Sequence, residues 1–309
     1  MIYQHTLAQP LTISGIGLHT GREITMQLRP AEAGTGIVFH RREGERCVSI
    51  EAISANVVDT RMATVLGKNG LSVSTVEHFM AALYTLGIDH LHVDIDGPEV
   101  PIMDGSARQF IQMLRGAGRR QLAQPRKFLA IRKPITLVAG EKRINIIPSR
   151  FMRISSEISF DHPSIGLQRR AIKLSPELFE RDIAPARTFG FFEEVEYLKA
   201  NGLARGGSLD NAIVIDKSGI MNPEGLRFGD EFVRHKILDT IGDFSLIGYP
   251  LLGHIRTYKG GHDINHLMVE KILAATDSWQ LVEFNEADLQ NQSPQSAVAG
   301  LRELVFSRS

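Results

Sequence analysis

One segment of the chain carries a histidine and two aspartates at intervals of four residues: His235, Asp239 and Asp243 in EFVRHKILDTIGDFSLIG. This spacing keeps all three side chains on one face of an α-helix, because four residues advance the helix by only about 40° beyond a full turn. A His/Asp pair one turn apart can supply two ligands of a divalent metal from a rigid element. The alternative is a solvated polar face. The flanking apolar residues argue against it, since they predict a buried helix in which an unpaired carboxylate is costly.

A second candidate is the adjacent pair Glu77–His78 in STVEHFMAAL. Ser74 and Glu77 have the spacing of a capping box, in which Glu77 would bind the backbone of Ser74, and His78 on an apolar helix would be a core histidine. The functional alternative makes His78 a third metal ligand and Glu77 a general base for an attacking water. The sequence pattern leaves both interpretations open.

Two further histidines, His262 and His266, lie four residues apart after Gly260-Gly261. They fit a second metal pair, or a site in which one of them is a general acid. His19 lies in the glycine-rich GIGLHTG. This segment does not indicate a phosphate loop, because it lacks the GK[ST] ending and no helix follows.

The first half of the chain reads as strands followed by two helices. Residues 1–66 alternate apolar and polar side chains between glycines and prolines, which predicts short strands. Helical spacing begins near Ser74 and ends at Gly87, a suitable residue for the left-handed turn after a helix. A strand, a turn and a second helix at about 106–115 follow.

The second half repeats this order after a polar segment at 117–127, which we interpret as a linker. Strands come first, followed by the helix of His235, a glycine, a strand, a turn and a last helix at about 262–274. The repeat predicts a duplicated α+β unit with helices packed on sheets and the two histidine-bearing helices meeting at the seam. We therefore expect domains at residues 1–120 and 126–309.

The second half also contains an additional stretch at 185–216, which reads as a helix over Phe191–Ala200, a Gly-Gly turn and a strand. Phe191, Val195 and Leu198 form an apolar stripe with helical spacing in this stretch. Such a stripe is by default part of a core. It fits equally an apolar groove for a lipid chain, and the pattern alone leaves both interpretations open.

Composition narrows the classes of function. The 309 residues include 35 lysines and arginines and 35 aspartates and glutamates, so the balance gives no reason to expect nucleic-acid binding. Cys47 is the only cysteine, which excludes an intrachain disulfide and a thiolate metal cage. We see no signal peptide and no apolar run near the roughly 18 residues that span a bilayer. We therefore expect a cytoplasmic monomer with at most peripheral membrane contact.

Several long segments resemble a known family. They are STVEHFMAALYTLGID, EVPIMDGSA, ARTFGFFEEVEYLKANGLARGGSLDNAIV, GLRFGDEFVRHKILDTIGD and YKGGHDIN. In order and spacing they closely resemble the UDP-3-O-acyl-N-acetylglucosamine deacetylases (LpxC) of Gram-negative lipid A biosynthesis, over nearly the whole chain. The resemblance implies an α+β fold, a two-domain duplicated sandwich with its active site at the domain junction. It also implies hydrolysis of the N-acetyl group of a UDP-linked acylated amino sugar.

The resemblance implies a metal site and a set of catalytic groups. The family's ligands fall on His78, His235 and Asp239, which leave the fourth position of a zinc ion open for catalysis; iron(II) is an alternative metal. Glu77 then corresponds to the base that takes a proton from the attacking water, and His262 to the group that protonates the leaving amine.

Further positions correspond to supporting and substrate-binding residues of the family. Asp243 would orient His262, and the Thr188 hydroxyl would bind the oxyanion. The substrate contacts fall on Lys236 and Lys259 at the diphosphate, Phe160 near the uracil and Phe189 beside the sugar. The passage for the 3-O-acyl chain falls on the additional stretch, including Phe191, Val195 and residues 204–208.

Two other classes of function compete with this one. A zinc peptidase is disfavoured because the chain has no HExxH motif. A non-catalytic module of the same fold with a structural metal is the second alternative. This alternative is disfavoured, because a binding module does not need Glu77, Thr188 and His262 together.

Overall fold

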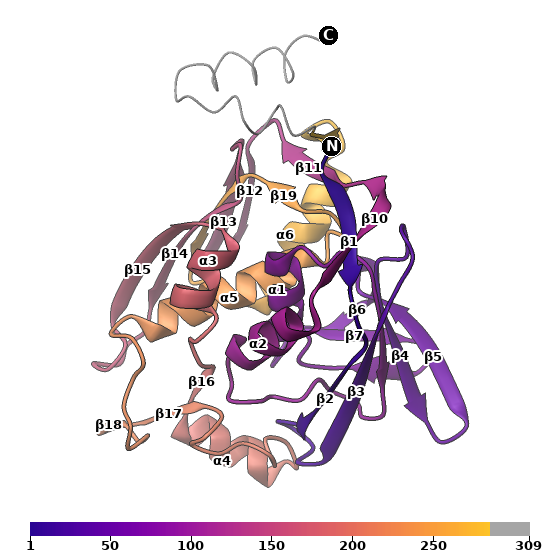
Figure 1. Cartoon of the computed structure of the whole chain (residues 1–309). Helices are drawn as coiled ribbons and strands as arrows, with labels where there is room; N and C mark the ends of the chain where they lie inside the picture. The colour runs from indigo at the N-terminus through magenta and orange to yellow at the C-terminus, as the bar shows by residue number, and fades with distance from the viewer. Residues whose placement is uncertain (285–309) are drawn as a thin grey trace.

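The computed structural model describes residues 1–284 and contains two five-stranded sheets with the same strand order (Figure 1). The first sheet consists of β2 (Leu11–Ile16), β3 (Glu23–Pro30), β9 (Leu91–Ile95), β4 (Ile37–Glu43) and β5 (Arg46–Glu51), in that spatial order. The second consists of β12 (Ile135–Ala139), β13 (Lys142–Ile147), β20 (His254–Tyr258), β14 (Arg153–Ser159) and β15 (Leu167–Lys173).

The two sheets share pairing as well as order. In each sheet the last strand of the chain enters between the second and third strands, antiparallel to the second and parallel to the third. Such a repeated non-sequential order is not expected by chance. It confirms the predicted duplicated α+β architecture, which the sequence pattern indicated without any detectable identity between the halves.

Helices cover one face of each sheet. Six helices occur among residues 1–284, and not all of them lie on these two sheets: α1 (Glu77–Leu86), α2 (Arg108–Ala117), α3 (Pro176–Leu178), α4 (Phe192–Ala200), α5 (Glu231–Ser245) and α6 (His262–Ala274). In the second sheet alternate residues such as Ile144, Ile154 and Ile255 are fully buried beneath α5 and α6. Their period of two reflects the alternation of side chains along a strand, and this burial removes the apolar faces of both layers from water.

The helices α1 and α5 pack against each other in the centre of the molecule (Figure 1). Gly242 makes this close approach feasible, because a Cβ atom at this position would lie 2.0 Å from the carbonyl oxygen of Glu77. No side chain fits in that space. The crossing brings the Glu77–His78 pair beside the face of α5 that carries His235 and Asp239.

Most of the polar segment at 117–127, which we interpret as a linker, forms a strand that the sequence pattern did not predict. β10 (Arg119–Pro125) pairs antiparallel with β1 (Tyr3–Leu7) at the start of the chain. Only Leu122 is buried in β10, so the segment lacks the apolar alternation that marks a strand. Its partner lies more than a hundred residues away. The domain boundaries at 120 and 126 remain predictions.

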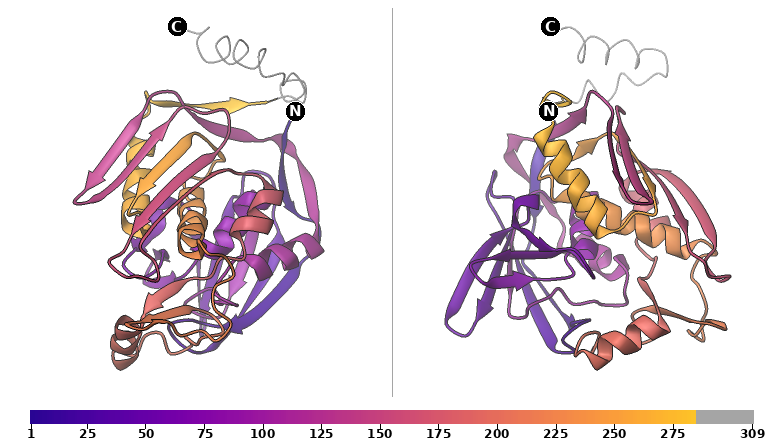
Figure 2. Two further views of the ribbon diagram at one scale, coloured as in Figure 1. Left: turned by 90° about the vertical axis from the view of Figure 1, so that its left-hand side faces the viewer. Right: turned by 180° about the vertical axis from the view of Figure 1, so that it is seen from behind.

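Three smaller sheets complete the described part of the chain. They are β11 (Lys127–Ile131) with β19 (Leu251–Leu252) and β21 (Trp279–Glu283); β6 (Val57–Asp59) with β7 (Val65–Lys68) and β8 (Leu71–Val73); and β16 (Phe189–Phe191) with β17 (Ile213–Asp216) and β18 (Gly219–Ile220). The strand expected after the helix of His235 is thus divided between two sheets, as β19 and β20. The last sheet and α4 form the additional stretch, at the end of the molecule away from the N-terminus (Figures 1 and 2).

The start of α1 also differs from the prediction. The helix begins at Glu77 itself, and no side chain caps it, so the predicted capping box of Ser74 and Glu77 is wrong. The Glu77 carboxylate instead accepts a hydrogen bond from the backbone N–H of Thr64 at 3.1 Å. The end of the helix is as predicted, since Gly87 has a φ of +67°. No helix between residues 1 and 284 is long and apolar enough to cross a membrane.

Candidate active site

Two histidines and an aspartate converge where α1 and α5 cross. The ligand atoms of His78, His235 and Asp239 all lie within 4.8 Å of one another, and all three side chains are buried. Asp239 Oδ1 is 3.2 Å from Nε2 of His235 and 3.5 Å from Nε2 of His78. Ligands about 2.0–2.1 Å from a tetrahedral ion are separated from one another by about 3.3 Å, so the spacing suits such an ion.

One oxygen of this group lacks a hydrogen-bond partner within the described structure. Asp239 Oδ1 is buried without a hydrogen-bond partner among residues 1–284, which is a costly arrangement for a carboxylate oxygen. Two imidazole nitrogens and one carboxylate oxygen are a donor set that divalent transition metals accept. The residues present therefore fit a divalent cation.

The protonation states of the group favour metal binding. Burial lowers the pKa of His235 to about 3, so its imidazole is neutral and its nitrogen can act as a ligand. Burial alone would raise the pKa of Asp239, but the positive charges of Lys236 and His262 outweigh burial and hold this pKa well below its usual range. The carboxylate is therefore ionised. Lys236 Nζ donates to the second oxygen, Oδ2, at 3.0 Å, which leaves Oδ1 facing the two imidazoles.

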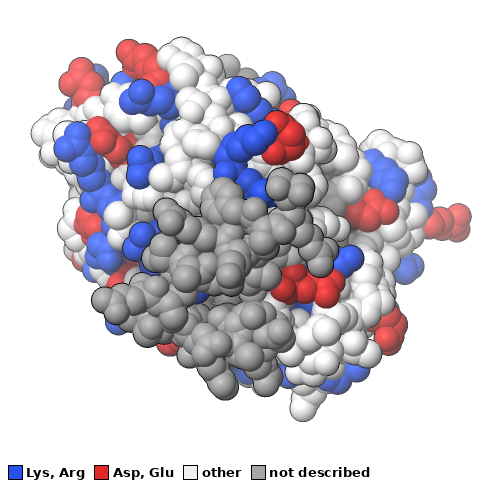
Figure 3. Space-filling view, turned by 90° about the horizontal axis from the view of Figure 1, so that it is seen from above, with Lys and Arg blue, Asp and Glu red and all other residues white. Residues whose placement is uncertain are grey.

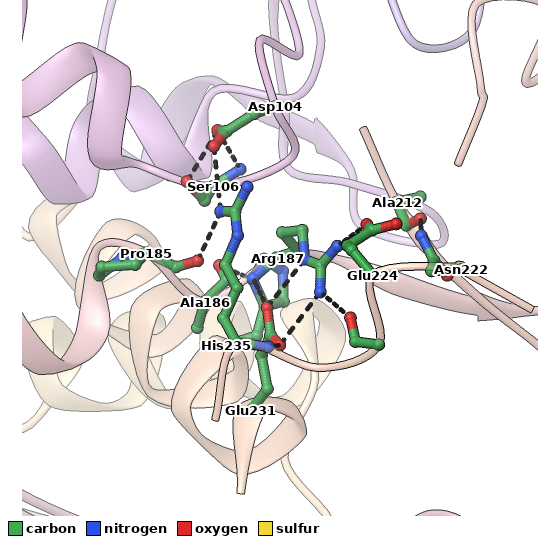
Figure 4. Close-up of polar contacts among 12 residues, drawn as sticks. Asp104, Ser106, Pro185, Ala186, Arg187, Ala212, Asn222, Glu224, Glu231 and His235 are labelled. Carbon is green, nitrogen blue, oxygen red and sulfur yellow. Dashed lines mark hydrogen bonds and ion pairs between the residues drawn. The ribbon is translucent and has the colours of Figure 1, made fainter. Parts of the chain in front are cut away.

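The ring of His235 is held in place by the backbone that precedes β16. Its Nδ1 lies 3.0 Å from the carbonyl oxygen of Ala186 (Figure 4). Because that oxygen can only accept, Nδ1 carries the proton and Nε2 is free to bind a metal. This contact is the outer-shell support that ligating histidines commonly have.

The segment that supplies this carbonyl is anchored by a buried ion pair. Arg187 is 1% exposed, and its backbone N–H and its Nε both donate to Glu231 Oε1 at 3.0 Å. Glu231 lies one turn before His235 on α5, so the helix that carries the ligand also fixes the segment that orients it (Figure 4). Arg227 adds a bond to the carbonyl of Pro185 at 2.8 Å and an ion pair with Asp104 at 3.0 Å. Removing either Arg187 or Glu231 would leave the charge of the other buried without this partner.

An acid–base group lies beside the metal-binding residues. His262 is the first residue of α6, and its Nδ1 is 2.9 Å from Asp243 Oδ2. The other nitrogen, Nε2, lies 3.9 Å from Glu77 Oε1 and 4.0 Å from Asp239 Oδ2. Asp243 thus directs Nε2 of His262 toward Glu77 and the metal-binding group.

Burial and neighbouring charges shift the pKa values of Glu77 and His262 in directions that suit acid–base catalysis. Burial raises the pKa of Glu77, and the carboxylates of Asp243 and Asp239 raise it further, against the opposing effect of His262 and His78. Burial by itself would lower the pKa of His262, but Asp243, Glu77 and Asp239 raise it to about 10. At neutral pH His262 is therefore protonated, and the raised pKa makes Glu77 a stronger base than an exposed glutamate.

The three metal-binding residues, together with Glu77 and His262, face one cavity of about 820 Å³. Its polar wall includes Glu77, His78, Thr188, Lys236 and His262. Its apolar wall includes an aromatic cluster. The ring of Phe160 packs edge-on against that of Phe189, with 5.8 Å between the ring centroids, and its centroid lies 6.0 Å from that of Phe191. The cavity can therefore hold a ligand with a polar part at the metal-binding group and an apolar part along the additional stretch.

Some predicted residues lie elsewhere. Val195 is not part of the cavity wall and packs over Gly190, whereas Leu198 and Tyr197 of the same helix do line the cavity. Lys259 pairs with Glu141 at 2.6 Å beside the cavity. His266 lies 3.7 Å from Glu270. It is not a member of the metal-binding group found among residues 1–284.

Two residues of the site have no role in the sequence prediction. Thr64 donates its hydroxyl to Asp243 Oδ1 at 2.6 Å and its N–H to Glu77, which links the two carboxylates. Asn265 donates to Asp243 Oδ2 at 2.8 Å. Asn265 lies three residues after His262 and therefore on the same face of α6. This spacing could have indicated from the sequence that Asn265 belongs to the site. Thr64 lies in a loop without any periodic pattern.

The fold and the site together define a class of protein. It is an α+β protein with a buried His₂Asp group and an adjacent acid–base pair, all open to one cavity, a site of the type that hydrolytic enzymes build around a divalent cation.

Comparison with known proteins identifies the family. Residues 4–274 match the family model described as UDP-3-O-acyl N-acetylglycosamine deacetylase. Three relatives carry the name UDP-3-O-acyl-N-acetylglucosamine deacetylase. They are proteins of Syntrophotalea carbinolica (70% identity over 93% of each chain), Geotalea uraniireducens (54% over 95% of each) and Myxococcus xanthus (50% over 93% of this chain and 91% of the relative). The chain belongs to this family of deacetylases.

Proposed function

We propose that the protein is a cytoplasmic, zinc-dependent deacetylase. Its substrate is UDP-3-O-(3-hydroxyacyl)-N-acetylglucosamine, and the products are the free amine and acetate, as a step of lipid A biosynthesis. The observation that carries the proposal is the convergence of the His₂Asp group with Glu77 and His262 on one cavity. The names of the relatives support the choice of substrate.

The reaction demands two kinds of assistance, because an amide is a poor electrophile with a poor leaving group. When bound by His78, His235 and Asp239, a divalent cation such as zinc, with iron(II) as an alternative, supplies Lewis-acid polarisation of the acetamido carbonyl. Glu77 accepts a proton from water as the water oxygen attacks the carbonyl carbon. Its raised pKa makes it a stronger base than an exposed glutamate.

The second proton transfer completes the cleavage. Protonated His262, held by Asp243, stabilises the developing negative charge with its positive charge and donates a proton to the departing nitrogen. The Thr188 hydroxyl, on the cavity wall, is the proposed donor to the oxyanion. The carbon–nitrogen bond breaks, acetate takes up the water oxygen, and the amine retains both electrons of the broken bond.

Substrate binding follows the division of the cavity into polar and apolar walls. We assign Lys236 and Lys259 to the diphosphate, Phe160 to the uracil and Phe189 to the sugar. The acyl chain extends along the additional stretch, past Phe191 and Leu198. The active site thereby lies between the two proposed domains, with ligands from α1 on one side and α5 on the other.

The test is deacetylation of this substrate by purified protein before and after chelation, with zinc restored in about equimolar amount. We expect activity to vanish on chelation and to return with zinc. A folded, metal-loaded protein without activity would instead favour the non-catalytic module of the same fold.

The passage for the acyl chain gives a separate prediction. Replacing Leu198 by tryptophan fills the apolar wall of the cavity, so we expect the preferred chain to become shorter by several methylene units. The energy involved is about 0.8 kcal/mol for each buried methylene. The measurement is kcat/KM for a series of 3-O-acyl lengths.

The matched control for the passage is Val195→Trp on the same helix. Because Val195 packs on Gly190 and not along the cavity, its replacement should shift the preference less. An unchanged chain-length profile in both variants would mean that the whole stripe is only a packing surface.

A further inference from the structure

The second sheet has one face covered by α5 and α6 and an opposite face that no helix covers within residues 1–284 (Figure 2, left). The side chains on the open face alternate with the buried isoleucines of the same strands. Its charged members are five cations, Arg143, Arg153, Arg169, Lys173 and Arg256, and one carboxylate, Glu157. All five cations are exposed.

Most of these cations form no ion pair with another residue of the described part of the chain. Glu157 pairs with Arg169 at 2.8 Å, and that is the only ion pair on the open face within residues 1–284. Arg153 of β14 and Lys173 of β15 are paired directly across the two strands. On the other side of β14, Arg256 of β20 lies opposite the residue two positions after Arg153. Burial lowers the pKa of nearby His254, and Arg256 and Arg153 lower it further, which reflects the positive potential there. The open face thus carries an uncompensated positive charge.

The duplicated fold provides an internal comparison. The corresponding outer face of the first sheet carries two arginines, Arg29 and Arg42, against three carboxylates, Glu23, Glu51 and Asp94. Arg29 pairs with Asp94. The face seen from above likewise intersperses both signs of charge (Figure 3). The architecture therefore does not require the basic face, and the chain as a whole has no net charge.

Apolar side chains lie among the cations of the same face. Val138 is 62% exposed and Leu167 is 56% exposed, both at outward positions of edge strands. Lys173 Nζ lies 3.6 Å from the centre of the Phe151 ring. Exposed aliphatic groups between basic side chains suit an interface of anionic headgroups and acyl chains better than a nucleic-acid backbone, which offers the aliphatic groups no apolar partner.

We infer that this open face docks the protein on a membrane surface that contains anionic lipids. The charges of the face complement such a surface, and its exposed Val138 and Leu167 can reach the headgroup boundary. The face also adjoins the active site, because β14 continues directly into Phe160 and β13 begins at Lys142, both of which line the cavity. The inference goes beyond the proposed function, although a substrate with an acyl chain would give the docking a purpose.

The test is cosedimentation of the full chain with vesicles. We expect binding to vesicles of phosphatidylglycerol and phosphatidylcholine in equal parts, and little binding to phosphatidylcholine alone. Each basic residue near an anionic surface contributes about 1 kcal/mol. The double variant Arg153→Glu/Arg256→Glu should therefore lower the partition coefficient by at least about 10-fold. High salt should have a similar effect, because it screens the same charges.

The matched control is Arg42→Glu/Arg108→Glu, which makes the same change in net charge at two exposed arginines of the first half. This control should bind vesicles like the parent. An equal loss in both double variants, or no binding of the parent to anionic vesicles, would overturn the inference. Stronger binding to a short DNA or RNA duplex, with the same dependence on Arg153 and Arg256, would replace the membrane by nucleic acid.

Vesicle binding and deacetylation are separate measurements. The Arg153/Arg256 variant leaves every residue of the cavity wall intact, so its kcat on dispersed substrate should equal that of the parent. Vesicle binding without deacetylase activity would leave the docking inference standing and remove the proposed function. Deacetylase activity without vesicle binding would leave the proposed function standing and remove the docking inference.

Discussion

Replacing Glu77 by glutamine is expected to lower kcat by about 10²- to 10⁴-fold, the usual contribution of a positioned general base. Glutamine keeps the size of the side chain and an oxygen that can accept from the Thr64 N–H. It cannot take a proton from water. Metal content should stay the same, because Glu77 is not a member of the His78, His235 and Asp239 group. The measurements are steady-state kinetics and metal analysis of the same sample.

A control must separate lost chemistry from the loss of a buried charge. Glu99 serves this purpose, since it is 1% exposed and accepts hydrogen bonds from the backbone N–H groups of His19 and Thr20 outside the cavity wall. Glu99→Gln should alter stability more than turnover. If Glu77→Gln retained the turnover of the parent, His262 or another group would have to be the base, and the assignment of Glu77 would fail.

The sequence predicted those parts of the site that lie on single helices. Helical spacing alone placed His235, Asp239 and Asp243 on one face of α5, where the structure has them. The sequence pattern left the partnership of these residues with His78 as one of two interpretations, and the family resemblance then implied it. It depends on the crossing of α1 and α5 at Gly242, and such a contact between segments about 160 residues apart leaves no periodic signal.

The same distinction between local and distant contacts explains the errors. Ser74 and Glu77 match a local capping pattern, but the Thr64 N–H, thirteen residues away in a loop, competes for the Glu77 carboxylate and binds it. The β10 strand was missed because its pairing with β1 is non-local and its side chains are polar. By contrast, the hairpin of β7 and β8 turns at Asn69-Gly70, both with positive φ, and this local signal could have been used.

Replacing His235 by alanine is expected to have the other large effect, on metal affinity. It removes one of the three proposed ligands and also the ring whose Nδ1 bonds the Ala186 carbonyl. Loss of a single outer-shell partner already weakens metal binding by about 10- to 100-fold, so loss of a ligand should exceed this. Competition with a chelator measures the affinity. His266→Ala is the control, because this histidine lies on α6 beside Glu270 and outside the metal-binding group.

The two variants together distinguish a catalytic site from a structural one. In a catalytic site, Glu77→Gln binds metal without turnover, while His235→Ala loses both metal and turnover. Circular dichroism and thermal melting must show that the apoprotein remains folded, because a structural metal would contribute to folding itself. Unfolding of His235→Ala and of the chelated parent alike would assign the metal a structural role. A folded His235→Ala protein that binds metal as tightly as the parent would remove His235 from the ligand set.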